Sequence, residues 1–387
     1  MMKRILWMSF FLLLQFNLWA QTGISFRDLT FKEAMKVAKV EKKLIFLDCY
    51  TSWCGPCKML AKKIFPDPTV GEFFNEKFVS LQMDMEKAEG PELGKKYKVG
   101  AYPTLLFIDE KGELKHSVCG YMSAEALLQQ AQVALKGEKT LEAMTARYDA
   151  GEREDDFVEE YLELLFNASQ EKKQEEVASE YIGKMDAAHF HSRKTWDLLQ
   201  KHLSDPLSPI LKKAYRTRFR FGHLVGGDTI NIYFDYTQRR AVNAFVWRNP
   251  KQSSFNQKRY DDLLQFLRSS EQSTTPQNIA TLYVVKQVEE GNLRGMIDEM
   301  KQALHYGIFY DGDAKLRFFQ NFMRHVQNTE QKALALEMDA MIHQTIEESV
   351  VDYYQTELTK LRIQLLNSIG ETEKAAELEQ TLPKRRG

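Results

Sequence analysis

The sequence has few cysteines and almost no net charge, and each shortage excludes a class of protein. Four cysteines in 387 residues are too few for a small fold held together by disulfides. The 53 lysines and arginines balance 54 aspartates and glutamates, so a net charge of −1 provides no field that would attract nucleic acid or an anionic membrane. Hydrophobic residues at 43% exclude wholesale disorder and a multi-span membrane protein. The length indicates two or three domains.

The N-terminus has the pattern of a signal peptide. Lys3 and Arg4 precede an apolar run from Ile5 to Leu14, which is shorter than the ~20 residues that a membrane-spanning helix needs. Ala20 supplies the small residue expected at the cleavage position. We therefore expect residues 1–20 to be removed after Ala20 and the mature protein to be exported, to the periplasm of a bacterium or to the outside. An uncleaved N-terminal anchor is the alternative.

Strand and helix patterns alternate from residue 21 to residue 137, which predicts an α/β domain with a central mixed sheet flanked by helices. The first predicted strand is a continuous apolar run, as expected for a strand buried on both faces. The predicted elements are a helix over Phe31–Glu41, strands over Leu44–Leu47, Phe78–Met83, Thr104–Ile108 and Leu114–Cys119, and a closing helix capped by Ser123 that runs to Leu135.

One short motif follows the first predicted strand, and it contains two of the four cysteines. Residues 53–57 read Trp-Cys-Gly-Pro-Cys. Cys54 stands at a helix start, where free amide groups and the positive end of the helix dipole favour a thiolate. Cys57 lies one helical turn later, so it can attack a mixed disulfide on Cys54 intramolecularly and release the substrate. Pro56 falls in the first turn, where its missing N–H costs little.

Two stretches of the chain resemble the thioredoxin superfamily, and specifically the exported bacterial thioredoxin-like proteins. Residues 46–58 match the strand and active-site turn of that family, and residues 100–107 match its cis-proline loop and the strand after it. Gly120 fits the glycine that ends the last strand. The resemblance covers less than a third of the chain and implies a thioredoxin-like domain over residues 21–137.

The resemblance also implies a role for each residue of the site. Cys54 is the attacking thiol, Cys57 the resolving thiol, and Pro103 the cis-proline that seats the substrate backbone. Asp48 matches the buried carboxylate that assists proton transfer at the resolving cysteine. No metal and no cofactor is implied. The expected substrate-binding residues adjoin the cysteines and the cis-proline, and they are Trp53, Gly55, Pro56 and Tyr102.

Departures from the family pattern bear on the redox chemistry. Ser80 stands where many thioredoxins place a lysine beside the buried aspartate, and Lys62 replaces the usual helix-kinking proline. Tyr102, before the cis-proline, is bulkier than the isoleucine common there. Gly-Pro between the cysteines favours a reductant, because thioredoxin has a potential near −270 mV, whereas export favours oxidation or isomerisation. The direction of electron flow therefore stays open.

Other roles for the cysteines need partners at the right distance. Paired cysteines also bind zinc when a second pair completes the site, but His116 and Cys119 lie three apart in a predicted strand and point to opposite faces. In the resembled fold Cys49 and Cys119 are about two strand spacings apart, ~9.6 Å, which exceeds the ~7 Å limit for a disulfide. We expect Cys49 and Cys119 to be buried free thiols and the motif to be redox-active.

Residues 138–387 show apolar residues at helical spacing, which predicts an all-α, loosely repetitive helical domain. Helix-glycine-helix junctions at Gly151, Gly291 and Gly370 share no repeat period. We interpret the basic and aromatic residues of segment 212–221 as a solvated helix face over a buried aromatic stripe, not as a nucleic-acid site. The region shows no pattern for hydrolysis, phosphate or metal, so we expect it to bind a partner protein or to self-associate.

Together these patterns predict an exported thiol–disulfide oxidoreductase that reduces or isomerises protein disulfides through a Cys-Gly-Pro-Cys dithiol. Its expected partners are disulfide-containing protein substrates and a membrane thiol-electron donor, and the charge balance argues against nucleic acid. Two alternatives remain. The redox pair could regulate a helical domain that binds a partner protein, or the protein could be a thiol reductase of cytochrome c maturation.

Overall fold

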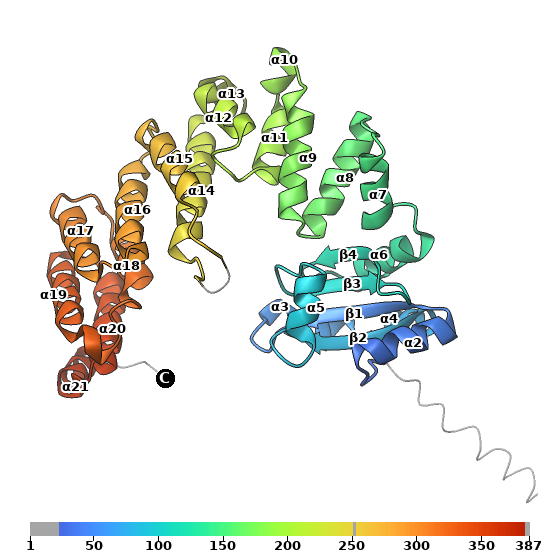
Figure 1. The fold of residues 1–387 in the computed structure, drawn as a ribbon, viewed down its shortest axis with the longest axis horizontal. Coiled ribbons are helices and arrows are strands. Elements are labelled where there is room, and N and C mark those ends of the chain that lie inside the picture. Colours follow the sequence, from blue (N-terminus) through green and yellow to red (C-terminus); the bar gives the residue numbers. More distant parts are fainter. Residues whose placement is uncertain (1–22, 251–252, 384–387) are drawn as a thin grey trace, which may run out of the picture. The chain divides into compact units, whose positions relative to one another are not determined.

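The computed structural model describes residues 23–250 and 253–383, so the predicted signal peptide lies outside the described residues. The chain forms two compact units, Met1–Tyr181 and Ile182–Gly387. Figure 1 shows the strands gathered in the first unit and helices in the second. Within the two described ranges, no helix is long and apolar enough to cross a membrane.

The first unit is built on a four-stranded mixed sheet with the strand order β2-β1-β3-β4. β1 pairs parallel to β2 and antiparallel to β3, and β3 pairs antiparallel to β4. Residues 45–49 of β1 are all buried, which explains the apolar run. The predicted mixed sheet is confirmed, and its strands are Leu44–Tyr50 (β1), Phe78–Asp84 (β2), Thr104–Ile108 (β3) and Leu114–Cys119 (β4).

Helices cover both faces of this sheet. α2 and α5 pack on one face, where Phe31 and Leu93 join one hydrophobic core. α4 and α6 pack on the other face, where Phe74 and Leu127 join the core around Phe46. The helices of this part of the chain are Phe31–Glu41 (α2), Gly55–Met59 (α3), Pro68–Lys77 (α4), Gly90–Lys96 (α5), Ala124–Lys136 (α6), Leu141–Asp149 (α7), Asp155–Asn167 (α8) and Glu171–Gly183 (α9), with a π-helical turn over Leu60–Ile64 after α3.

One helix of the unit has no signal in the sequence. α5 contains Gly90 and Gly94, which are poor helix formers. It forms because Leu93 and Tyr97 are buried against the sheet, so tertiary packing overrides local propensity. α6, by contrast, begins at the predicted cap, where the Ser123 hydroxyl accepts a hydrogen bond from a backbone amide of the first turn.

Beyond α6 the first unit continues as helices. Gly137 ends α6 in the left-handed conformation, with φ of 80°. Lys115 of β4 then forms an ion pair with Glu142 of α7 at 3.0 Å. α7 and α8 thus belong to the first compact unit. The border between an α/β and a helical domain at residue 137 stays a prediction.

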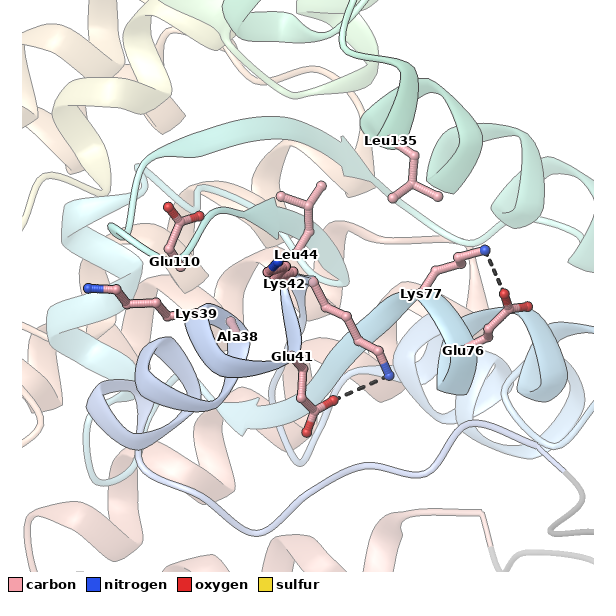
Figure 2. Close-up of a pocket in the computed structure, with 10 residues that line it drawn as sticks. Ala38, Lys39, Glu41, Lys42, Leu44, Glu76, Lys77, Glu110 and Leu135 are labelled. Atoms are coloured by element: carbon pink, nitrogen blue, oxygen red, sulfur yellow. Dashed lines mark hydrogen bonds and ion pairs between the residues drawn. The ribbon is translucent and has the colours of Figure 1, made fainter.

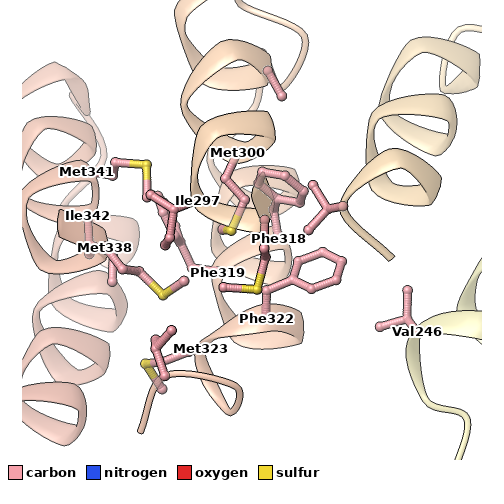
Figure 3. Close-up of a cluster of buried hydrophobic side chains, with 14 of the residues drawn as sticks. Val246, Ile297, Met300, Phe318, Phe319, Phe322, Met323, Met338, Met341 and Ile342 are labelled. Carbon is pink, nitrogen blue, oxygen red and sulfur yellow. The ribbon is translucent and has the colours of Figure 1, made fainter. Parts of the chain in front are cut away.

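The second unit consists of helices and turns in the residues that the structure describes, which confirms the predicted helical region. Its core gathers aromatic and sulfur-containing side chains, among them Phe318 and Phe322 of α18, Met300 of α17 and Met338 of α19 (Figure 3). The helices are Ala187–Phe190 (α10), Arg193–His202 (α11), Pro209–Arg216 (α12), Arg218–Val225 (α13), Gly227–Val246 (α14), Gln257–Arg268 (α15), Thr275–Glu289 (α16), Leu293–His305 (α17), Gly312–Met323 (α18), Lys332–Glu348 (α19), Asp352–Ser368 (α20) and Thr372–Thr381 (α21), with a 3-10 turn over Thr329–Gln331.

Candidate active site

The predicted dithiol lies at the carboxyl end of β1, where the chain turns into α3. Cys54 and Cys57 form a disulfide with an S–S distance of 2.03 Å and a Cα–Cα distance of 5.4 Å. Cys54 is the N-cap of α3, and its sulfur accepts a hydrogen bond from the Cys57 amide at 3.1 Å. Pro56 falls in the first turn, so no helix hydrogen bond is lost. The same amide stabilises a thiolate on Cys54 when the disulfide is reduced.

The two sulfurs lie just under a surface formed by the other residues of the motif. Cys54 is 3% exposed and Cys57 is 6% exposed, whereas Trp53 is 64% exposed. Gly55 and Pro56 are exposed as well. A thiolate attacks a disulfide at one sulfur, so exchange requires that a substrate reach only one of the two sulfurs. The pair is shielded from bulk solvent and bordered by a surface that a substrate can contact.

Two aromatic residues of the predicted site pack together. The Trp53 ring lies edge-on to the Tyr102 ring with centroids 6.1 Å apart, and the Trp53 indole N–H donates to Glu86 at 3.0 Å. The Tyr102–Pro103 peptide bond is cis, and Pro103 directly precedes β3. Because β3 runs antiparallel to β1, its start lies at the same edge of the sheet as the motif. The fold therefore brings the predicted substrate-binding residues to one edge.

Asp48 is a buried carboxyl on β1, 2% exposed. Side chains alternate along a strand, so Asp48 points to the face of the sheet that α6 and the π-helical turn after α3 cover. Its Oδ2 accepts a hydrogen bond from the Gln82 amide at 3.0 Å, and its Oδ1 has no partner within the described residues. Burial raises the pKa of Asp48 to about 7, because the Gln82 amide offsets only part of the lost hydration. Such a carboxyl is suited to proton transfer near neutral pH.

Sequence reasoning missed two residues of this site, Gln82 and Glu86. The register of β1 and β2 pairs position 48 with Gln82 and places Ser80 opposite Phe46, so Gln82 is the side chain beside the buried aspartate. Glu86 reaches Trp53 because β2 is parallel to β1 and ends at the same edge. Neither residue has a signal in the motif itself. Both depend on strand register, which the motif does not specify.

Replacing Asp48 by asparagine should make the stability of the oxidised protein less dependent on pH. The folded protein holds the Asp48 proton up to about pH 7, whereas the unfolded chain loses it at about pH 4, so the wild type loses stability as the pH rises between these values. The stability of Asp48→Asn relative to wild type should therefore increase by on the order of 3 to 4 kcal/mol between pH 4 and pH 8. Guanidinium unfolding at both pH values measures the change.

Ser80→Ala is the matched control for this experiment, because Ser80 is buried on the neighbouring strand and carries no charge. Its stability relative to wild type should be the same at both pH values. If Asp48→Asn and wild type show parallel pH dependence, the raised pKa of Asp48 is wrong.

The other two cysteines are free thiols, as predicted, but the predicted burial holds for Cys49 alone, because Cys119 at the end of the edge strand β4 is half-buried. Cys49 and Cys119 both pair with Thr104, so β3 separates them by two strand spacings. Burial and the nearby Asp48 charge raise the pKa of Cys49 well above its usual range, which keeps this thiol protonated. Cys54 and Cys57 are bonded to each other, so their sulfurs are not zinc ligands in this form.

A pocket at the opposite end of β1 is not part of this site. It lies beside Leu44 at the start of the strand, which is ~20 Å from the strand end that leads into the motif. Figure 2 shows that its wall is rich in lysine and glutamate, with Lys77 paired to Glu76 and Glu41 paired to a lysine. These paired surface charges form no redox or catalytic group.

Comparisons with known proteins agree with this geometry. A family model described as a thioredoxin-like domain matches residues 31–134. The thioredoxin of Echinococcus granulosus is 35% identical over 86 residues, which cover 22% of this chain and 75% of that protein. The thiol:disulfide interchange protein DsbD of Actinobacillus pleuropneumoniae serotype 5b is 37% identical over 111 residues, which cover 26% of this chain and 19% of that protein. This chain spans less than a fifth of the length of the DsbD proteins that it matches.

A solution structure from Bacteroides thetaiotaomicron is also similar to part of this chain. That protein has a provisional disulphide-isomerase name and is 53% identical, with 30% of this chain and 95% of that chain covered and a TM-score of 0.28. The family model falls on the unit that contains the disulfide.

Proposed function

Because the chain belongs to the thioredoxin superfamily, we propose that it is an exported thiol–disulfide oxidoreductase that reduces or isomerises protein disulfides. The observation that carries this proposal is the Cys54–Cys57 disulfide at the start of α3, bordered by exposed residues. Gly-Pro between the cysteines favours the reducing direction, as in thioredoxin. The two sulfurs themselves carry the two electrons, so the reaction needs no cofactor.

In the reducing direction the Cys54 thiolate attacks one sulfur of a substrate disulfide. A bond forms between Cys54 and that sulfur, and the second substrate sulfur leaves as a thiolate that takes up a proton. Cys57 loses its proton to Asp48 and attacks the Cys54 sulfur, which releases the first substrate sulfur. Two electrons have then moved to the substrate, which departs as a dithiol, and the Cys54–Cys57 disulfide is restored.

The substrate chain contacts the surface around the disulfide. Trp53, Gly55 and Pro56 supply the exposed wall on the motif side, and the half-buried Tyr102, with the buried Pro103 beside it, supplies the wall at the start of β3. The hydrogen bond from Trp53 to Glu86 and its contact with Tyr102 hold the indole in place.

Export and a membrane electron donor complete the proposal. The signal-peptide pattern of residues 1–20 supports export, with cleavage after Ala20. An exported dithiol is oxidised in each turnover, so a membrane thiol-electron donor must return two electrons to the pair. The similarity to DsbD, a thiol:disulfide interchange protein, supports exchange with a redox partner. We further propose residues 21–137 as the redox domain and residues 138–387 as a helical domain that contacts protein partners.

Reduction of insulin tests the proposed activity. The full-length protein with dithiothreitol as donor is expected to cleave the interchain disulfides of insulin and to produce turbidity from the insoluble free chain. The rate should rise in proportion to protein concentration. Turbidity no faster than with dithiothreitol alone would contradict disulfide reduction as the function.

A further inference from the structure

The second unit contains a small polar cavity that the redox function does not use. Its volume is about 100 Å³, and α14, α16, α18 and the segment before α18 enclose it. Four side-chain amides from three helices line it, Asn243 of α14, Gln277 and Asn278 of α16, and Asn321 of α18. A water molecule takes roughly 30 Å³ of liquid, so the cavity has room for one carboxylate or amide group of a ligand and for nothing much larger.

These amides have almost no partners within the described residues. Gln277 is 8% exposed, and its buried Oε1 has no hydrogen bond. Asn278 is 5% exposed and makes one long side-chain hydrogen bond, to Thr274 at 3.4 Å. The Asn243 and Asn321 side chains line the cavity without a hydrogen bond to the rest of the described chain. Asn243 and Asn321 are half-buried, whereas buried amides are normally paired, so the unpaired Oε1 of buried Gln277 among three further amides points to a ligand that brings its own donors and acceptors.

One arginine at the rim of the cavity has no ion pair within the described residues. Arg239 of α14 is exposed at its rim and has no acidic partner in the part of the chain that the structure describes. Arg317 of α18 is also at the rim and pairs with Asp313 one turn earlier. Asp311 is the acidic residue in the wall, and its carboxylate is engaged in capping α18. The free guanidinium of Arg239 is suited to a carboxylate, which it can bind with two parallel hydrogen bonds.

Exposed aromatic side chains lie beside the cavity, and a buried hydrophobic core lies behind its wall. Tyr310 lines the cavity and is 68% exposed, and Tyr236, one turn before Arg239 on α14, is 47% exposed. Exposed aromatic rings of this kind often anchor a bound chain. Phe318 forms part of the wall and is packed in the buried core shown in Figure 3, so the amides lie on an ordered framework.

We propose that this cavity binds an extended acidic segment of a partner protein. A side-chain amide offers a donor and an acceptor side by side, which matches the N–H and C=O of a peptide group, so one peptide group of the segment fits into the cavity among Asn243, Gln277 and Asn321. A carboxylate of the segment pairs with Arg239, and its apolar residues pack on Tyr236 and Tyr310. Binding does not depend on the redox chemistry of the first unit.

Selection of a random dodecapeptide phage library on the full-length protein tests this proposal. We expect acid-rich peptides to be enriched. The strongest of them, labelled with fluorescein and followed by anisotropy, should bind at least tenfold more weakly to Arg239→Ala and to Gln277→Met. Asn231→Ala is the matched control, because Asn231 is exposed on α14 outside the cavity, and its affinity should stay within twofold of wild type.

Two further readouts separate this proposal from misfolding and from the redox function. Gln277→Met replaces an unpaired buried amide by a side chain of similar length, so its melting temperature should not fall below that of wild type. The Cys54→Ser variant should bind the peptide as tightly as wild type. Absence of enriched peptides, enrichment of peptides without acidic residues, or binding to Gln277→Met or Arg239→Ala that is as tight as to wild type would each overturn the proposal.

Discussion

The Cys57→Ser variant is expected to stop after the first exchange step and to accumulate as a mixed disulfide between Cys54 and its substrate. In the wild type Cys57 is held next to Cys54, with a Cα–Cα distance of 5.4 Å, and resolves the mixed disulfide intramolecularly. Such proximity corresponds to an effective concentration on the order of 10⁵ M or more. Serine provides no thiol, so the complex should persist at least ~1000-fold longer than in the wild type.

Intact mass spectrometry and non-reducing gels measure this trapping after the reduced variant is mixed with insulin. The expected product has the mass of the protein plus an insulin chain, and dithiothreitol should release it. The matched control carries Cys54→Ser as well as Cys57→Ser and should trap nothing. Trapping by the double variant, or none by Cys57→Ser, would show that Cys54 is not the attacking thiol.

The Cys54→Ser variant is expected to lose at least ~1000-fold of the insulin-reducing activity, because none of the remaining thiols, Cys49, Cys57 and the half-buried Cys119, is a helix N-cap with a resolving cysteine one turn later. Cys57 is the resolving thiol of the pair, and once Cys54 is replaced no second cysteine in the motif can resolve a mixed disulfide formed on it. Cys49 is fully buried, and its raised pKa keeps it protonated. The rate of insulin precipitation with dithiothreitol measures the loss.

Cys119→Ser is the matched control for the loss of activity. Cys119 is a free thiol on β4, outside the motif, and its replacement should leave the rate within twofold of wild type. Equal rates for wild type and Cys54→Ser would remove the dithiol from the mechanism. A comparable loss in Cys119→Ser would mean that the activity depends on more than the motif.

The α/β unit could be predicted well from the sequence because its signals are local. The apolar run of β1, the caps of its helices and the Trp-Cys-Gly-Pro-Cys motif each reflect a few neighbouring residues. α5 escaped prediction because its glycines argue against a helix, and only burial of Leu93 and Tyr97 forms it. Gln82 and Glu86 escaped because strand register, not spacing along the chain, brings them to Asp48 and the motif.

The helical unit could be predicted in class but not in detail. Gly291 and Gly370 have positive φ at the predicted helix junctions, since glycine adopts that conformation without strain. The predicted buried aromatic stripe of segment 212–221 is wrong for Phe219, which is 66% exposed, although Tyr215 and Phe221 are buried. The polar cavity had no signal, because its amides come from three helices whose approach is decided by packing.

The reactivity of the native cysteines toward iodoacetamide tests the central claim most directly. The protein is alkylated without denaturant, oxidised or after reduction by dithiothreitol, and the labelled peptides are identified by mass spectrometry. We predict that Cys54 is unreactive in the oxidised protein, becomes reactive within minutes after reduction, and is protected again after reoxidation. If Cys54 stays unreactive in the reduced protein until the chain is unfolded, no substrate can reach it, and the proposed exchange chemistry is contradicted.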